Sequence, residues 1–230
     1  MIATHSIHRF QLDGPGSEPS DEELVRKILG GDIEELAVLM RRHNQRLYRI
    51  CRSVVTNDAE AEEAVQEAYL RAYRHLNQFR GESKFSTWLT KIAVYEALSR
   101  RRRLSRLVPL ESGSGLRPQL VSKQRNPEQE TINRDLGRQL EKAIDSLPPN
   151  YRTVFVMRHV EGLSTDDTAA SLMLSRESVK TRLLRSRRML QEKLRPHVVD
   201  QPSENVHPFL GVRCDGLIDR VMKRIIQHAG

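Results

Sequence analysis

The chain has 230 residues, of which 38% are hydrophobic and 5% aromatic, and its formal net charge is +8. This length allows one or two modest domains with small aliphatic cores, and the excess of cations indicates a polyanionic partner, most often nucleic acid. We expect no signal peptide, because the N-terminus lacks an apolar run after a basic start. We expect no integral membrane protein, because no apolar stretch approaches the roughly 20 residues that span a bilayer. Two distant cysteines, Cys51 and Cys214, fit a cytoplasmic protein better than a disulfide framework.

The N-terminal part of the chain changes from an irregular to a helical pattern. Residues 1–20 carry Gly, Pro and Ser with little periodicity, so they are expected to form a disordered tail. Apolar residues recur at helical spacing from Asp21 onward. Gly30-Gly31 interrupts this pattern once, which predicts a short helix followed by a longer one.

Two further helices are predicted before the pattern is lost. The capping sequence TND at residues 56–58 precedes a stretch that is acidic at its start and basic at its end, which suits the helix dipole. After the loop FRGESKF, another helix begins near Ser86 and reaches the arginines at 100–103. Residues 21–103 are therefore expected to form a first helical domain.

The rest of the chain separates into a linker, a second domain and an extension. Residues 104–130 are rich in Pro, Gly and Ser and predict a flexible linker. Helical patterning resumes over residues 131–196, with breaks at the sequences LPPN and EGL, and residues 197–230 end in an amphipathic helix. No β-type alternation of useful length occurs, so the predicted fold class is all-α, with two small helical domains, a linker and a C-terminal amphipathic helix.

A helix-turn-helix is predicted in the second domain. Residues 164–167, STDD, resemble a capping box and open a short helix, which a tight turn joins to the cationic stretch SRESVKTRLLRSRR. On a helix this stretch has a narrow apolar seam and a broad cationic face, which fits either a solvated helix or a helix in the major groove. The residues expected to meet base edges and phosphates are Arg176, Glu177, Ser178, Lys180, Thr181 and Arg182, with Arg185 on the phosphates.

Met173 is an unusual residue for the turn of this motif. The position is often Gly, because the backbone there tends to need a positive φ. A residue with a Cβ atom loses roughly 1 kcal/mol or more in that conformation.

Two stretches together resemble the sigma-70 family of RNA polymerase sigma factors, in its extracytoplasmic-function (ECF) group. AEEAVQEAYLRAYRHLNQFRGESKFSTWLTKIAVYEALSRRRR resembles region 2, and LEKAIDSLPPNYRTVFVMRHVEGLSTDDTAASLMLSRESVKTRLLRSRRML resembles region 4. The resemblance covers roughly residues 21–196, with both motifs in the family's order. It implies a protein that binds core RNA polymerase, directs it to promoters and assists melting. Region 4 would read the −35 element as duplex, and region 2 the −10 element, partly as single strand.

The resemblance assigns recognition of the −10 element to the loop GESKFS and the helix after it. Aromatic and cationic side chains interleave there, as the capture of unwound DNA requires. The candidates are Lys84, Phe85, Ser86, Trp88, Lys91, Tyr95, Arg100 and Arg101. Trp88 is equally well spaced for a core stripe. Tyr95 stands where the family's most familiar pattern has Asn, which predicts an altered −10 preference, because an amide and a phenol contact bases differently.

The acidic helix after residue 58 has two interpretations. Its acids suit the N-terminal dipole of a solvated helix. The resemblance gives Glu63, Gln66 and Glu67 the further role of contacting basic residues of the polymerase clamp. Partners expected from the family are core RNA polymerase, promoter DNA and an anti-sigma factor, with no small-molecule substrate.

The C-terminal extension lies outside the family pattern. Its last helix has a wide apolar stripe that a short isolated helix cannot bury. Docking on the protein's own domains, a protein partner and a membrane surface are the alternatives, and the hypothesis is that it packs on the second, promoter-reading domain. His207 and Cys214 are too few to make a metal site.

Two rival classes of function follow from the same residues. An enzyme is not expected, because the sequence has no P-loop, nucleophile elbow or metal-spaced cluster, so no catalytic residue, metal or cofactor is predicted. A stand-alone helix-turn-helix regulator that binds duplex DNA is the alternative. That class would not explain the acidic and aromatic-basic pattern over residues 58–103.

Overall fold

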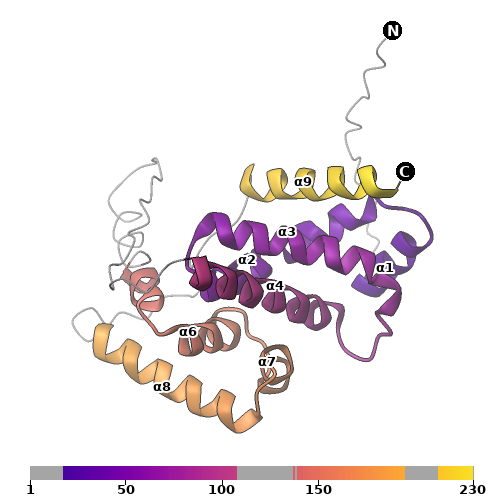
Figure 1. Ribbon diagram of the computed structural model, residues 1–230. Coiled ribbons are helices and arrows are strands. Elements are labelled where there is room, and N and C mark those ends of the chain that lie inside the picture. The colour runs from indigo at the N-terminus through magenta and orange to yellow at the C-terminus, as the bar shows by residue number, and fades with distance from the viewer. Residues whose placement is uncertain (1–17, 108–136, 138, 195–211, 230) are drawn as a thin grey trace, which may run out of the picture.

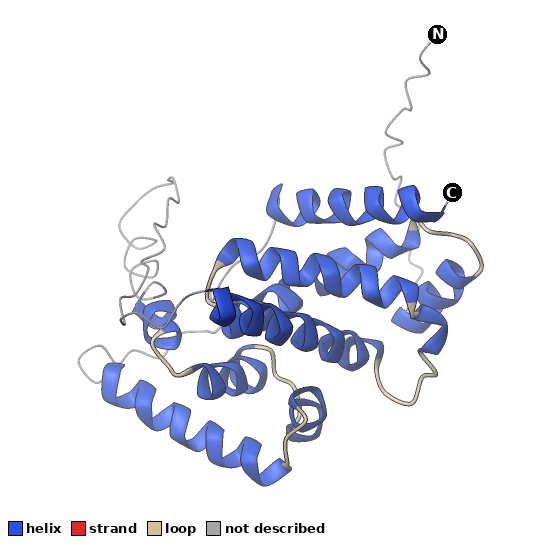
Figure 2. Ribbon diagram, in the orientation of Figure 1, coloured by secondary structure: helices blue, strands red, loops and turns tan. Residues whose placement is uncertain are grey.

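The computed structural model describes residues 18–107, 137, 139–194 and 212–229. Every regular element among these residues is helical, and none of them is a strand (Figure 2). The all-α fold class is therefore confirmed for the described part of the chain. Most of the expected tail, residues 1–20, and of the expected linker, residues 104–130, lies outside the described residues.

The first domain is a helical bundle built around α2, α3 and α4. Its core includes Leu39, Leu47, Tyr69 and Leu89, each at most 1% exposed. The elements are α1 (Asp21–Leu29), α2 (Glu35–Val55), α3 (Asp58–Arg74), the short 3-10 turn η1 (Leu76–Gln78) and α4 (Phe85–Leu107). The predicted break at Gly30-Gly31 separates α1 from α2, and α4 continues past the expected boundary at residue 103.

Side-chain caps explain where α1 and α3 begin. Ser20 Oγ accepts a hydrogen bond from the backbone N–H of Glu23 at 3.2 Å, and the Glu23 carboxylate accepts one from the backbone N–H of Ser20 at 2.7 Å. This reciprocal capping box makes Ser20 part of the first domain rather than of the expected tail. Asn57 caps α3 by accepting from the backbone N–H of Glu60 at 3.1 Å, as the sequence TND predicts.

The second domain combines short helical segments with one long helix, α8, joined by tight turns. Its elements are α6 (Pro149–Phe155), the π-helical turn η2 (Val156–Val160), α7 (Thr165–Leu172) and α8 (Arg176–Leu194). Pro148 is extended at the N-cap of α6, and Gly162, with φ 63°, ends the helical run after η2. Both predicted breaks are confirmed, and the second one uses the freedom of glycine at positive φ.

The two domains pack against each other through an apolar seam. Ile50 of α2 and Val94 of α4 form one cluster with Met157 of η2 and Leu163 of the loop after it. Figure 1 shows the second domain lying along α2 and α4.

Polar contacts border this seam. Both guanidinium NH groups of Arg52 donate to the carboxylate of Asp145, at 3.3 and 3.0 Å. Glu161, after η2, lies 3.3 Å from Arg49 and 3.6 Å from Arg46 of α2. Burial raises the pKa of Glu161, and the two arginines offset only part of that effect.

The C-terminal helix α9 (Val212–Ala229) lies along α2 and α3, on the side of the bundle away from α6, α7 and α8 (Figure 1). Its apolar stripe is buried against these two helices, so docking on the protein's own domains is confirmed. The hypothesis that the stripe packs on the second domain is wrong. The first domain offers acids that pair with the arginines of α9, whereas α8 is itself cationic and would repel them. No helix among the described residues is long and apolar enough to cross a membrane.

Candidate nucleic-acid and polymerase interfaces

The predicted helix-turn-helix is formed by α7 and α8, and local hydrogen bonds fix its geometry. Ser164 caps α7 by accepting from the backbone N–H of Asp167 at 3.0 Å. Met173 then adopts φ 53° and ψ 47°, so the expected positive φ is confirmed. Ser175 Oγ accepts from the backbone N–H of Ser178 at 3.1 Å, which begins α8. The second helix therefore projects from the first at a defined angle.

α8 has the narrow apolar seam and the broad polar face that its sequence predicts. Val179 is fully buried against Val154 and Ala169, and Leu190 is buried further along. The candidate residues all lie outside this seam: Arg176, Glu177, Lys180, Thr181 and Arg185 are exposed, and Ser178 and Arg182 are half-buried. An exposed cationic helix face of this kind can meet a duplex, with arginines reaching guanine edges or phosphates.

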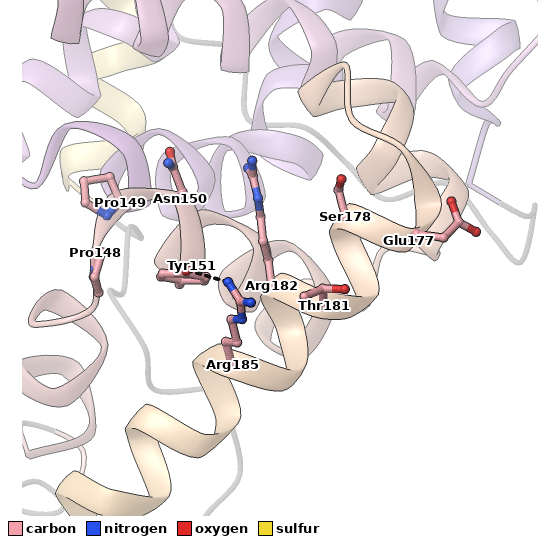
Figure 3. Close-up of a pocket in the computed structure, with 9 residues that line it drawn as sticks. All are labelled: Pro148, Pro149, Asn150, Tyr151, Glu177, Ser178, Thr181, Arg182 and Arg185. Carbon is pink, nitrogen blue, oxygen red and sulfur yellow. Dashed lines mark hydrogen bonds between the residues drawn. The ribbon is translucent and has the colours of Figure 1, made fainter.

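The exposed face of α8 is continued by the start of α6, which the sequence analysis missed. A hollow of about 450 Å³ separates the two helices (Figure 3). It is lined by Pro148, Pro149, Asn150, Tyr151, Glu177, Ser178, Thr181, Arg182 and Arg185. Arg185 donates to the hydroxyl of Tyr151 at 3.4 Å. The sequence PPNY predicts a helix break, but the contact of Tyr151 with Arg185, 34 residues further along the chain, leaves no local pattern.

The candidates for unwound DNA lie on α4 and on the loop before it, with unequal exposure. Lys84, Lys91 and Tyr95 are exposed, Tyr95 at 46%, and Ser86 and Trp88 are half-buried. Tyr95 lies under the guanidinium of Arg71, whose carbon is 4.7 Å from the ring centroid.

Phe85 differs from its neighbours because its ring belongs to the core. It is 3% exposed and lies beside the rings of Phe79, His43 and Trp88, with centroids 5.4, 5.8 and 5.7 Å away. The ring packs between His43 of α2 and Phe79 of the loop before α4. Phe85 is therefore not part of the exposed surface of α4 in this structure, and Trp88 is only half-exposed on it.

The second domain reaches the start of α4. Thr87 Oγ1 donates to the carboxylate of Asp167 in α7 at 3.1 Å. Hydrogen bonds from Ser164 and Thr87, with the nearby charge of Lys84, hold the pKa of Asp167 below its usual value despite partial burial. α7 and the candidate surface on α4 are therefore neighbours.

Arg100 and Arg101 lie further along α4 and are half-buried. Arg100 pairs with Glu60 and lies 3.9 Å from Glu63, so its charge is partly neutralised by α3. Arg102 and Arg103 are more exposed and extend the cationic end of the helix.

The polymerase-binding candidates on α3 lie partly under α9. The side chain of Glu63 is 48% exposed, but Gln66 is only 6% exposed. Arg220 of α9 donates to Gln66 Oε1 at 3.3 Å, and Arg224 donates to Glu67 Oε1 at 2.8 Å. The structure therefore brings the three candidates onto one helix and places α9 over two of them. The sequence analysis gave no role to these arginines, because contacts over more than 150 residues leave no local pattern.

Both halves of the chain match known protein families. Residues 39–107 match the family model described as Sigma-70 region 2, and residues 137–190 match the one described as Sigma-70, region 4. The chain is 30% identical over 177 residues to "ECF RNA polymerase sigma factor SigW" of Bacillus subtilis, covering 74% of this chain and 95% of that protein. It is also 30% identical over 188 residues to "ECF RNA polymerase sigma-E factor" of Escherichia coli K12, covering 77% and 95%.

Two solved structures share the fold. CnrH, in complex with the cytosolic domain of CnrY, superposes with a TM-score of 0.54 at 23% identity, over 77% of this chain and 99% of that one. The sigma factor RpoE of Bartonella quintana, in complex with the anti-sigma factor NepR, gives a TM-score of 0.52 at 23% identity, over 75% and 99%. Both support the arrangement of two small helical domains.

Proposed function

Since this chain belongs to the ECF group of the sigma-70 family, we propose that α8, α4 and α3 each bind a different component: the −35 element, the −10 element and core RNA polymerase. The chain binds core RNA polymerase and directs it to initiate transcription at specific promoters.

The −35 element is read by α8 in the major groove. The observation that carries this proposal is the exposed polar face of α8, which follows the left-handed turn at Met173. The first turns of α8, from Arg176 to Arg182, meet base edges, because the N-terminal part of a recognition helix enters the groove most deeply. Arg185, next to Tyr151, contacts backbone phosphate and fixes the register of the helix.

The −10 element is held as unwound strand along the exposed side of α4. Lys84 and Lys91 supply cations beside the exposed ring of Tyr95 and the exposed part of Trp88, which is the combination that binds single strands. Arg100 and Arg101 follow the phosphates upstream. Phe85 supports this surface from the core and does not contact a base.

Core RNA polymerase is held by α3 through Glu63, Gln66 and Glu67. The support is their position on one helix of the first domain, on a side distinct from the cationic face of α8. An acidic surface of this kind attracts basic residues of a partner and repels DNA. The chain would work where the polymerase is, in the cytoplasm. It would catalyse no reaction itself. An anti-sigma factor would be a further protein partner.

Transcription from defined templates tests the proposal. Core polymerase, the chain and a library of genomic fragments should give run-off transcripts with fixed start sites, and core polymerase alone should not. Footprinting of the chain without polymerase should show little protection of duplex DNA. Tight binding by the chain alone, with no start-site-specific transcript, would favour a stand-alone regulator instead.

A further inference from the structure

The docking of α9 covers part of the surface to which the proposed function assigns polymerase binding. Its apolar side enters the core of the first domain, where Leu217 and Val221 are fully buried and Ile218 and Ile225 are 3% exposed. Burial of this extent gives α9 a stable position on α2 and α3, since removal of apolar area from water is the main favourable contribution to docking.

The cationic side chains of α9 are matched to the polar side chains of α3. Arg213 and Arg220 both reach the carboxylate of Glu62, at 2.8 and 3.3 Å. One turn further along α3, Arg220 also reaches Gln66, and Arg224 reaches Glu67. The arginines at 213, 220 and 224 are spaced by seven and four residues, which places them on one side of a helix. α9 thus presents a row of cations to a row of acids.

In the docked arrangement, α9 occupies hydrogen-bonding atoms of two of the three assigned residues. Gln66 is 6% exposed in the docked arrangement, and a carboxylate oxygen of Glu67 already accepts from Arg224. A polymerase surface that carries basic side chains would need these same atoms. It would compete with Arg220 and Arg224 for these groups, and full access to them requires α9 to leave α3.

We propose that α9 is an intramolecular competitor of core RNA polymerase, docked on the acidic surface of α3 until the polymerase displaces it. The inference rests on the proposed role of α3 and adds the regulation of that surface. A protein whose binding-competent form is only partly populated shows an apparent affinity reduced by that fraction. The docked helix therefore raises the concentration of polymerase or chain at which the complex forms.

Charge reversal on α9 tests the competition in the full chain. In the double variant Arg220→Glu, Arg224→Glu, the new carboxylates repel Glu62 and Glu67 and loosen α9. If α9 is docked in 90% or more of molecules, the dissociation constant for core polymerase falls by about tenfold or more. Lys223→Glu is the control, because it reverses one cation on the exposed side of the same helix, and it should bind as the wild type does.

A second measurement follows α9 in the unaltered protein. Cys214 lies on the buried side of α9, 8% exposed, with its sulfur 3.1 Å from the side-chain nitrogen of Asn44. Thiol labelling read by peptide mass spectrometry should be slow in the free chain and faster once core polymerase is bound. Cys51 is fully buried in the core of the first domain, and burial raises the pKa of its thiol, so it should stay unlabelled in both states.

The outcomes separate the inference from the function on which it rests. Tighter binding by the double variant, together with labelling of Cys214 in the complex, supports displacement. Equal affinities for wild type and double variant, or a Cys214 that stays protected in the complex, overturns the competition while leaving the sigma-factor function intact. Failure of wild type and variants alike to bind core polymerase would refute the assigned role of α3 itself.

Discussion

Arg152 of α6 donates its Nε hydrogen to the backbone carbonyl of Ser53 in α2, 2.6 Å away, and so joins the two domains. The same guanidinium donates to the carbonyls of Asp145 and Leu147, at 2.7 and 3.3 Å. Burial lowers the pKa of Arg152 to about 10, which still leaves the group charged at neutral pH. One side chain therefore satisfies carbonyls of both domains.

Arg152→Ala should destabilise the protein, because it removes the donors for these buried carbonyls and leaves a cavity at the seam. We expect a loss of about 2–4 kcal/mol in the free energy of unfolding, measured by urea titration of the full chain. Arg188→Ala removes a guanidinium that is 82% exposed and pairs with Glu192 of its own helix, and it should change the stability little. Equal stabilities for the two variants would mean that the contact contributes nothing.

Met173→Gly should stabilise the second domain. Met173 is held at φ 53° with its side chain 81% exposed, so glycine relieves strain without loss of packing. The expected gain in unfolding free energy is about 1 kcal/mol, read as a higher Tm. Met173→Ala keeps a Cβ atom and should stay near the wild type. A glycine variant that is less stable than the alanine variant would contradict the strain.

Tyr95→Asn should change the preferred −10 sequence, because an amide reads a base edge with two hydrogen bonds and a phenol mainly stacks. The measurement is selection of promoters from a randomised −10 library with reconstituted polymerase. Tyr95→Phe keeps the ring under Arg71 and should keep the preference. Identical selected sequences for wild type and Tyr95→Asn would remove Tyr95 from specificity.

Glu63→Arg should weaken binding of core polymerase by about tenfold or more, because it places a cation against basic residues of the partner. Glu63 is a cleaner choice than Glu67, since Glu67 also holds Arg224 of α9. The change is measured as the dissociation constant for core polymerase. Glu22→Arg, on the exposed side of α1, makes the same charge change away from α3 and should have no effect. Equal losses in both variants would point to net charge rather than to a contact.

Stability should fall on acidification because of His43. Burial lowers the pKa of His43, more strongly than Asp21 at 2.9 Å raises it, and Arg42 and Arg46 act in the same direction as burial. The unfolded chain therefore binds a proton on His43 more readily than the folded one. Stability is retained above the ordinary histidine pKa of about 6.5 and is lost as the pH falls through and below it.

Unfolding free energies at pH 7.5 and pH 5.5 check this dependence. His43→Gln should reduce the difference between the two pH values, and His159, whose pKa is also lowered by burial, should account for part of the remainder. Replacement of the exposed His75 should leave the difference unchanged. If the wild type is equally stable at both pH values, folding does not disfavour protonation of His43, and the prediction is wrong.

The local features of the fold could be predicted from the sequence, because their causes are local. The caps at Asn57 and Ser164, the break at Gly162 and the left-handed turn at Met173 each depend on residues within one or two turns. The face of α8 followed from the period of one helix, since Val179 and Leu190 set its buried side.

Features that depend on distant residues could not be predicted. The pattern at Phe85 is the same whether its ring enters the core or a DNA surface, and only its contacts with Phe79 and His43 decide. The pairing of Arg52 with Asp145 and of Arg224 with Glu67 joins segments 93 and 157 residues apart. An amphipathic stripe indicates that a helix docks, but the stripe does not specify its partner surface.

The apolar seam between the domains has a thermodynamic consequence. Ile50, Val94, Met157 and Leu163 are shielded from water only while the second domain stays against α2 and α4. Hydration of apolar surface raises the heat capacity of a protein. Any ligand that separates the domains will therefore add a positive heat-capacity increment to its binding, and calorimetry at several temperatures can register that opening without a label or a mutation.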